Sequence, residues 1–481
     1  MYRRALLLFI LAAVFNSAYD QESDSARKSI HQLESEYYGT LKKTTTDNFF
    51  KDYMFPATLE SNPGRNLTKR VLGWHPYWAS STAQNYYDFN ALTHIAYFSY
   101  EVDTANGSYS TIHEWNSTPL IGTAHLYGTK VLLTVTNFGI SRNTKILSDT
   151  VKQNTLINTI VLLLKARNGD GVNFDFESVG SSQRTNLVKF MTKAFKAIKK
   201  ELPVSEISMA APAVDWNSSW DVKALSYVCD YLVIMGYDYY YSGSSTAGPV
   251  APLETEAYNV TRSIDTYLSA GVPPEKLMLG VPWYGYDWPV SSNMRKASST
   301  GSATARIYTA AKSLAKTNGY TFDQMTKVPW VSYKSSSLWR QMWYDDSVSL
   351  SLKYALVNSK KIAGIGIWAL SYEGGIGEIW RTIKRAFTPP DTTLKNMEII
   401  VYPNPVHGIS RITFYLADKG NVSLRVVDVT GKVCAILQNG ELDAGRYSFD
   451  ISSASFGQGI YMCLLKVNKS MSSKKIIIIK E

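Results

Sequence analysis

Eight short apolar runs, separated by longer stretches of helical periodicity, constrain the fold of this 481-residue chain more than any other feature. The runs span residues 71–78, 92–102, 130–139, 170–179, 206–216, 229–238, 276–285 and 363–371. Between them lie amphipathic segments such as 185–202, whose apolar residues recur at helical spacing. Apolar strands that each precede a helix predict an α/β fold, a closed parallel (β/α)8 TIM barrel. An open doubly wound sheet is the alternative, but no GxGxxG motif follows the first strand.

The N-terminal residues differ in composition from the barrel. Residues 1–18 combine Arg3 and Arg4 with an apolar run and end on small residues, which is typical of a secretory signal peptide. No other stretch approaches the ~18 uninterrupted apolar residues of a membrane span, so no transmembrane segment is expected. Residues 19–68 are polar and are interpreted as an extension, in which 29–43 has the composition of one helix without a core signature.

The predicted barrel domain covers residues 69–388 and is followed by a second domain. The longest gap lies before the last strand, and its content predicts a small β-rich insertion. Residues 389–394 form a linker, because two consecutive prolines stop the preceding helix. In 395–481, short β-branched runs alternate with turn signals, a pattern that predicts a small all-β sandwich.

Composition excludes several classes of protein. Hydrophobic residues make up 45% of the chain, which excludes global disorder. Three cysteines exclude a disulfide scaffold, and without a CxxC motif or a Cys/His cluster no metal or other cofactor is expected. Cys434 and Cys463 could pair in an oxidising compartment, whereas Cys229 is expected to be a free core thiol.

Net charge and aromatic content allow either nucleic acid or carbohydrate as a partner. The chain carries a formal charge of +10, and 13% of its residues are aromatic. Residues 1–18 contribute +2, and residues 395–481 contribute +4 from eleven Lys/Arg and seven Asp/Glu. Because these two end segments carry +6 of the +10, only about +4 remains for residues 19–394, and no nucleic acid partner is expected. The aromatic residues then favour sugars.

Aromatic and polar side chains gather at the C-terminal ends of the predicted strands, where TIM barrels place their active sites. The set comprises Trp74, Tyr77, Trp78, Tyr97, Tyr100, Asn137, Asp215, Trp216, Tyr237, Asp238, Trp283, Tyr284 and Trp368. About half of these rings are expected to serve barrel–helix packing. The others predict a surface on which sugar rings stack.

Residues 170–177, DGVNFDFE, are the sharpest chemical signal. Side chains alternate along a strand, so Asn173, Asp175 and Glu177 share one face and three apolar side chains share the other. The apolar face suits the barrel–helix layer, so the polar face must point into the barrel. Two carboxyl groups are costly to bury there unless they serve a purpose.

The same motif resembles the DGxDxDxE signature of glycoside hydrolase family 18, the chitinases and related endo-β-N-acetylglucosaminidases. The resemblance extends over the barrel. It includes MGYD (235–238), AGPVAPL (247–253), GVPWYG (280–285) and the tryptophan of GIGIWAL, Trp368. It implies a retaining hydrolase of β-1,4-linked N-acetylglucosamine polymers, in which the substrate's own acetamide is the nucleophile.

The resemblance also implies roles for individual residues. Glu177 would protonate the glycosidic oxygen and then activate water. Asp175 would orient the acetamido N–H, Tyr237 would hydrogen-bond the acetamide carbonyl, and Trp368 would stack under the sugar. Met235 lies two residues before Tyr237, which predicts that both face the barrel interior. Further substrate contacts are expected from Asn173, Trp74, Tyr97, Asn137, Asp238 and Tyr284.

Three departures from the family pattern affect the choice of substrate. Asn173 stands where many members have Asp and cannot share a proton with Asp175, which should therefore ionise more readily. Phe176 replaces a commoner Trp, and TVTNFG (134–139) replaces a Gly-Gly-Trp. Asn also occurs at position 173 in members that resemble the spore-cortex and peptidoglycan branch. Peptidoglycan, N-glycans and a non-hydrolytic glycan-binding barrel therefore remain alternatives to chitin, although such binders usually lose the acid.

The C-terminal runs resemble a type IX secretion sorting domain of the Por family. The matching segments are VYPNP (401–405), VVDVTGK (426–432), LDAGRYSFDIS (442–452), GIYMCLLKV (459–467) and the basic, apolar end. The resemblance implies the type IX machinery as a partner and a location outside a Gram-negative cell, secreted or on its surface. A fibronectin-like or carbohydrate-binding sandwich is the alternative. The protein is expected to be a monomer.

Overall fold

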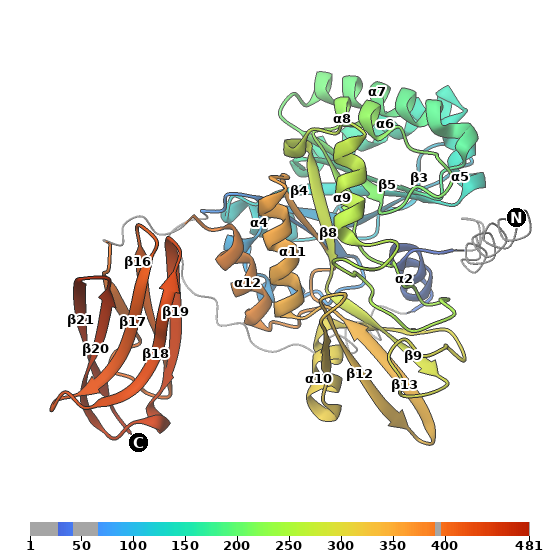
Figure 1. Cartoon of the computed structure of the whole chain (residues 1–481). Helices are drawn as coiled ribbons and strands as arrows, with labels where there is room; N and C mark the ends of the chain where they lie inside the picture. The colour runs from blue at the N-terminus through green and yellow to red at the C-terminus, as the bar shows by residue number, and fades with distance from the viewer. Residues whose placement is uncertain (1–26, 42–65, 390–395, 481) are drawn as a thin grey trace, which may run out of the picture. The chain divides into compact units, whose positions relative to one another are not determined.

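The computed structural model describes residues 27–41, 66–389 and 396–480 (Figure 1). Contacts divide the chain into two compact units, one ending at Phe387 and the other beginning at Thr388. The predicted signal peptide and most of the predicted linker lie outside the described residues. In the part of the chain that is described, no helix has the length and apolarity needed to cross a membrane.

The first unit is the predicted closed barrel of eight parallel strands. The strands are β1 (Arg70–Pro76), β2 (His94–Val102), β4 (Lys130–Phe138), β5 (Gly171–Glu177), β6 (Glu206–Pro212), β7 (Tyr231–Met235), β8 (Leu277–Pro282) and β14 (Gly364–Trp368). They run in the order β1-β14-β8-β7-β6-β5-β4-β2, and the pairing of β1 with β2 closes the barrel. A short strand, β3 (Tyr109–Thr111), pairs antiparallel with β2.

Helices follow most of the strands and cover the outside of the barrel (Figure 1). They are α4 (Leu120–Leu126), α5 (Ile140–Leu147), α6 (Thr150–Arg167), α7 (Arg184–Glu201), α8 (Val222–Tyr227), α9 (Val260–Ser269), α11 (Ser347–Ser359) and α12 (Gly377–Phe387). The first strand departs from the predicted alternation, because only two 3-10 turns, Ala83–Tyr86 and Phe89–Ala91, follow β1.

The predicted insertion before the last strand is a five-stranded antiparallel sheet with one helix. Its strands are β9 (Tyr284–Val290), β10 (Thr304–Ile307), β11 (Thr321–Asp323), β12 (Val328–Ser335) and β13 (Leu338–Tyr344), in the order β10-β9-β13-β12-β11. Helix α10 (Tyr308–Asn318) lies between β10 and β11 in sequence. Strand β9 begins two residues after β8, so the insertion grows directly from the C-terminal rim of the barrel.

Strand β5 has the two faces that its sequence predicts. The rings of Phe174 and Phe176 each lie 5.5 Å from that of Phe190 on α7, so the apolar face packs outward. The polar face points inward. Gly171 begins the strand with a φ of +154°, and a Cβ at this position would lie 1.9 Å from the carbonyl oxygen of Glu206. Only glycine lets β5 and β6 approach this closely.

The second unit is an all-β sandwich. One sheet has the order β15-β16-β19 and the other β18-β17-β20-β21. The strands are β15 (Ile399–Tyr402), β16 (Ile409–Leu416), β17 (Gly420–Asp428), β18 (Val433–Leu442), β19 (Gly445–Ser452), β20 (Gly459–Val467) and β21 (Ser470–Ile478). Apolar residues from both sheets, among them Phe414, Leu424 and Leu465, form its core.

The suggested pairing of Cys434 with Cys463 is wrong. Both cysteines are free, and one is exposed while the other is buried. Cys434 lies on β18 and Cys463 on β20, with β17 between them. Two strand spacings of ~4.8 Å exceed the reach of a disulfide. Cys229 is free and buried, as expected.

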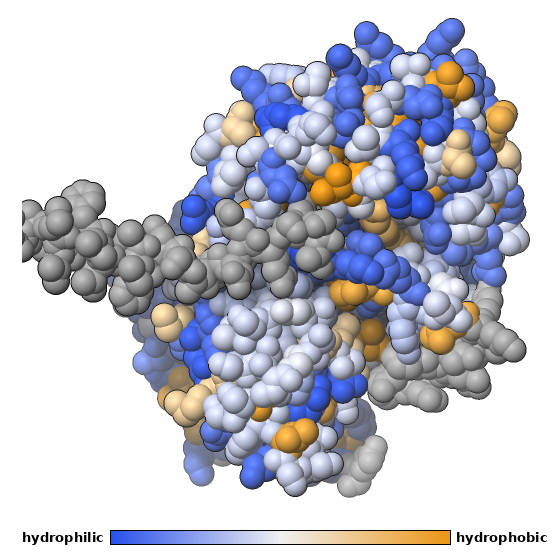
Figure 2. Space-filling view, turned by 90° about the vertical axis from the view of Figure 1, so that its right-hand side faces the viewer, coloured by the Kyte–Doolittle hydropathy of each residue, from blue (hydrophilic) through white to orange (hydrophobic). Residues whose placement is uncertain are grey.

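The helix expected in the N-terminal extension is α2 (Ile30–Gly39), capped by the side chain of Ser29, which accepts a hydrogen bond from the Gln32 backbone N–H. Although the sequence of this segment has no strong core signature, one face of the helix is buried. Ile30, His31, Glu34 and Tyr38 are all buried. The face of the molecule in Figure 2 is mostly hydrophilic, with hydrophobic residues scattered in small groups. The buried face of α2 packs against the mouth of the barrel, where His31 and Glu34 hydrogen-bond side chains of the rim.

Candidate active site

Three carboxyl groups meet at the C-terminal rim of the barrel. Asp175 and Glu177 lie on β5, and Asp238 follows the end of β7. All three are buried, with exposed fractions of 0%, 8% and 6%. Three buried carboxyl groups therefore lie together at the rim.

Asn173 lies one pleat deeper than Asp175. Its Oδ1 accepts a hydrogen bond from Trp74 Nε1 at 3.0 Å, and its Nδ2 donates to Ser208 Oγ at 2.9 Å. Both ends of the amide are therefore used across the barrel interior. Asn173 therefore holds the Trp74 indole in place.

The segment after β7 supplies a tyrosine and an aspartate. Tyr284 on β9 donates a hydrogen bond to Asp238 Oδ1, and the rings of Tyr237 and Tyr284 lie 6.1 Å apart. Asp238 has a φ of +58°, a left-handed conformation in which Asp is one of the few tolerated residues. The strand ends at Met235, and the Tyr237 N–H bonds the Met235 carbonyl. The prediction that Met235 and Tyr237 share a face therefore extends strand alternation past the end of β7. Of the two side chains, Tyr237 makes a hydrogen bond in the site, to His31.

Trp368 ends β14 and has aromatic neighbours on several sides. Its ring lies 6.1 Å from Trp74, 5.0 Å from Phe98 and 6.2 Å from Trp78. The indole is fully buried. It forms one wall of the space next to Asp175.

Two residues predicted to contact substrate do not join this group. Tyr97 packs in the layer outside the barrel, 5.7 Å from both His75 and Trp115, and accepts a hydrogen bond from the Glu114 N–H. Asn137 pairs in register with Phe176, an outward residue, and donates to Asn143 Oδ1 on α5. The strand alternation that turns Asp175 inward turns these two side chains outward. Trp283 likewise packs against Trp380 of α12.

Helix α2 contributes side chains that the sequence did not connect with the site. The His31 imidazole stacks on Trp368 with ring centroids 3.7 Å apart and planes inclined by 25°. Its Nδ1 lies 2.7 Å from Asp175 Oδ2, and its Nε2 lies 2.7 Å from the Tyr237 hydroxyl. Glu34 Oε2 accepts hydrogen bonds from Trp368 Nε1 at 2.9 Å and from the Tyr372 hydroxyl at 2.7 Å.

Burial dominates the proton affinities of the site. It raises the pKa of Glu177, and the neighbouring Asp175 charge adds to this effect, while His31 and the Ser29 hydroxyl oppose it. Burial also raises the pKa of Asp175, opposed by its hydrogen bond with Glu177. The sequence predicts that Asp175 ionises more readily beside Asn173 than beside an aspartate. Burial, which that prediction does not include, raises the pKa of Asp175. Burial lowers the pKa of His31 to about 4, so its imidazole is neutral at pH 7.

His31, Asp175 and Glu177 also have the donor types of a metal site, and one ligand atom from each lies within 4.8 Å of the others. Each ring nitrogen of His31 already has a hydrogen-bond partner, however. Hydrogen bonding thus accounts for the cluster among the described residues.

Comparison with known proteins identifies the barrel. The model of glycosyl hydrolases family 18 matches residues 70–373. The chain belongs to this family. Residues 400–480 match the secretion system C-terminal sorting domain, so the family 18 barrel is joined to an export module.

Relatives of the family 18 barrel have several substrates in their names. A cortical fragment-lytic enzyme of Bacillus anthracis is 26% identical over 317 residues, 62% of this chain and 68% of the relative. A di-N-acetylchitobiase of Rattus norvegicus is 28% identical over 233 residues, 43% of this chain and 62% of the relative. The chain thus spans about two thirds of the length of these curated relatives.

Solved structures share the fold. A family 18 chitinase from Cycas revoluta in complex with (GlcNAc)3 has a TM-score of 0.60 at 20% identity, covering 66% of this chain and 99% of that one. A spore cortex-lytic enzyme of Bacillus megaterium QM B1551 has a TM-score of 0.56 at 22% identity, covering 68% and 75%. A chitinase and a spore cortex-lytic enzyme therefore share the barrel architecture of this chain.

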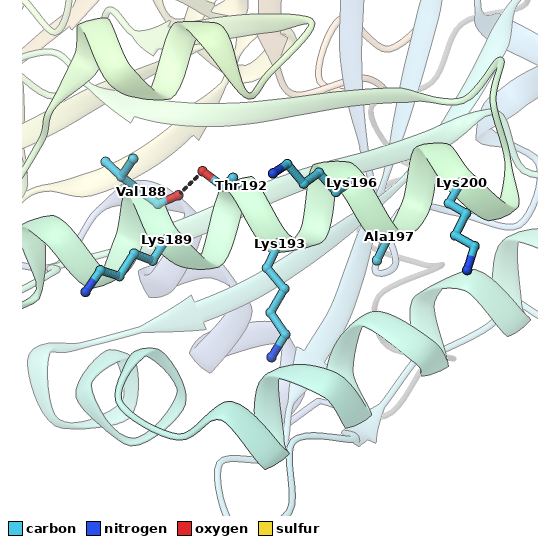
Figure 3. A pocket seen from close by; sticks show the side chains of 7 residues that line it. All are labelled: Val188, Lys189, Thr192, Lys193, Lys196, Ala197 and Lys200. Carbon is cyan, nitrogen blue, oxygen red and sulfur yellow. Dashed lines mark hydrogen bonds between the residues drawn. The ribbon is translucent and has the colours of Figure 1, made fainter.

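One surface hollow lies apart from this site. It lies on the outer side of α7 and is lined by Val188, Lys189, Thr192, Lys193, Lys196, Ala197 and Lys200 (Figure 3). Its lysines extend along one helix, and no carboxyl group lines it. The aromatic and acidic residues that suit sugar binding lie at the rim, where α2 covers them.

Proposed function

We propose that this chain is a secreted retaining glycosidase that hydrolyses β-1,4-linked N-acetylglucosamine glycans, with chitin or chitooligosaccharide as substrate. One observation carries the proposal: Asp175 and Tyr237 both contact the His31 imidazole, a flat polar group that is stacked on Trp368. A sugar on Trp368 would place its 2-acetamido group between the same two side chains.

The proposed mechanism uses the acetamide as nucleophile. Asp175 accepts a hydrogen bond from the acetamido N–H, and Tyr237 donates one to the carbonyl oxygen. The carbonyl oxygen attacks the anomeric carbon while Glu177 protonates the departing glycosidic oxygen. An oxazolinium ion forms, and Glu177 then removes a proton from the water that opens it. Two inversions at one carbon retain the configuration. The raised pKa of Glu177 suits a group that must hold a proton near neutral pH.

A second candidate is hydrolysis of peptidoglycan. It is favoured by the cortical fragment-lytic relatives and by Asn173, which bonds Trp74 where many family members have a second acid. N-glycan cores are a third N-acetylglucosamine substrate. A non-hydrolytic glycan-binding barrel is disfavoured by the presence of Glu177 at the rim.

Hydrolysis of a panel of glycans tests the proposal. Chitooligosaccharides, peptidoglycan and a high-mannose glycoprotein are incubated with the protein, and reducing ends are measured. We expect release from chitooligosaccharides, and loss of ~10²–10⁴-fold in Glu177→Gln, since general acid catalysis contributes about this much. Release from none of the three would contradict the glycosidase proposal. Undiminished turnover by Glu177→Gln would show that another group is the acid.

The sorting domain supports export of the barrel through the type IX machinery, out of a Gram-negative cell. We propose that the sandwich is the transported signal and that it is removed or retained at the cell surface. Deleting residues 396–481 should leave the barrel inside a host that has this machinery. Equal secretion of the truncated and full chains would contradict this role.

A further inference from the structure

We propose that α2 is an inhibitory segment of this chain, which occupies its own sugar-binding position with His31 in place of the substrate's acetamido group. The inference rests on the proposed function. A sugar stacked on Trp368 and the His31 imidazole, 3.7 Å from the same indole, need the same space. Substrate can therefore reach Asp175 only after α2 leaves.

His31 matches the acetamido group in chemistry as well as in place. A neutral imidazole has one N–H donor and one lone-pair acceptor, as the N–H and C=O of an acetamide do. In the tautomer that carries its proton on Nδ1, the imidazole donates to Asp175 Oδ2, and its Nε2 accepts from the Tyr237 hydroxyl. The pKa of Tyr237 is raised well above its usual range by burial, so it keeps this proton.

The remaining contacts of α2 cover the rest of the site. The Ile30 N–H donates to Asp238 Oδ2 at 2.9 Å, and His31 Nδ1 lies 3.4 Å from Glu177 Oε1. The positive N-terminal end of the helix thus faces the acidic cluster. Arg27 donates to the Asp238 carbonyl, and its guanidinium lies over the ring of Tyr241 at 4.6 Å. Tyr38 stacks on Trp78 at 5.0 Å.

The polarity of the buried face separates an inhibitory contact from ordinary packing. A helix that only completes a core buries apolar side chains, because polar groups are costly to bury. Helix α2 instead buries His31 and Glu34, and each of their hydrogen bonds ends on Asp175, Tyr237, Trp368 or Tyr372. Burial raises the pKa of Glu34 to about 8, a cost that only these bonds offset.

Substitutions on the two faces of α2 test the proposal in the full chain. His31→Ala combined with Glu34→Ala removes four buried hydrogen bonds. We expect kcat/KM for chitooligosaccharides to rise roughly 10²–10³-fold, since four bonds of about 1 kcal/mol each contribute ~4 kcal/mol and 1.4 kcal/mol is tenfold. His31→Asp should act in the same direction, because it places a further carboxyl group against Asp175 and Glu177.

Lys28→Ala and Glu36→Ala are the matched controls, since Lys28 lies just before α2, Glu36 lies on α2, and their exposed side chains pair with each other at 2.7 Å. Neither should change kcat/KM. A synthetic peptide of residues 27–41 should inhibit the His31→Ala/Glu34→Ala variant competitively, raising KM without lowering kcat. The same peptide with Ala at position 31 should inhibit less.

Glycan binding, followed by tryptophan fluorescence, separates failure of this inference from failure of the proposed function. If the inner-face variants bind a chitooligosaccharide, a peptidoglycan fragment or an N-glycan more tightly than the wild type but hydrolyse none, α2 is inhibitory and the glycosidase proposal fails. If they hydrolyse and bind no better than the controls, the inhibitory role is overturned. Absence of binding to all three glycans in every variant would overturn both.

Discussion

Asp170 immediately precedes strand β5, and Asp175 lies near the end of the strand. The two aspartates lie in opposite electrostatic environments. Asp170 accepts hydrogen bonds from His125 and from the Val131 N–H, with its side chain partly exposed. At the same end of the barrel, Glu206 is bound by His94 and Lys130. At the rim, Asp175 and Glu177 are buried beside each other and beside a histidine of α2.

The two ends use the same residue types with opposite effects on proton affinity. Burial alone would raise the pKa of Glu206, but the hydrogen bonds and charges of His94 and Lys130 outweigh it and lower this pKa to about 2. At the rim, burial wins and raises the pKa of Asp175 and Glu177. The N-terminal end thus holds fixed ions that stabilise the fold, whereas the rim holds groups ready to exchange protons.

The largest effect expected from a single hydrogen bond at the rim is that of Tyr237→Phe. Removing the hydroxyl deletes the proposed donor that positions the acetamide carbonyl oxygen for its attack on the anomeric carbon. Misplacing a reacting atom by about 1 Å can cost ~10²-fold, so kcat should fall roughly 10–100-fold. Steady-state kinetics in the His31→Ala/Glu34→Ala background measure this without interference from α2. An unchanged kcat would remove Tyr237 from the mechanism.

At the opposite end, Glu206→Gln should change stability and leave turnover alone. The substitution leaves His94 and Lys130 without their anion, and we expect a loss of about 1–3 kcal/mol in the free energy of unfolding at pH 7. Urea unfolding followed by tryptophan fluorescence is suitable, because all 12 tryptophans precede residue 388 and report on the barrel. A large fall in kcat with unchanged stability would break the distinction between the two ends.

The pH dependence of that difference is the finest test of the comparison. The folded-state pKa of Glu206, about 2, lies below the ordinary glutamate value of 4.5, so its ion pair stabilises the fold above pH 4.5. The contribution is lost as pH falls from about 4.5 towards 2. The stability gap between wild type and Glu206→Gln should therefore be constant from pH 7 to 5 and shrink below it. A gap that stays constant down to pH 3 would contradict the lowered pKa.

Most of the barrel could be predicted from the sequence, because each strand is a local apolar pattern and parallel strands must be buried on both faces. The faces of Asp175 and Glu177 followed from alternation inside β5. Tyr97 and Asn137 are expected at the site from the family resemblance and their place near strand ends, and the pairing of their strands with neighbours turns both side chains outward.

Helix α2 shows what a local pattern leaves out. Its buried residues, Ile30, His31, Glu34 and Tyr38, lie on one helical face, and this spacing is visible in the sequence. Two of the four are polar, so the stripe does not resemble a core face. Only the tertiary structure supplies their partners, which are Asp175, Tyr237 and Trp368 of strands more than a hundred residues away.

One pair of variants, Asp175→Asn and Asp170→Asn, tests the division between the two ends most directly. Asp175 lies on β5 and Asp170 immediately precedes it. Each substitution is made in the His31→Ala/Glu34→Ala background. Turnover of chitooligosaccharide and urea unfolding are measured for both. Asp175→Asn should lower kcat by ~10²-fold or more with no loss of stability. Asp170→Asn should keep kcat within about 3-fold and lose ~1–3 kcal/mol of unfolding free energy. Equal loss of kcat in both variants, or a loss of stability without loss of turnover in Asp175→Asn, would contradict the account.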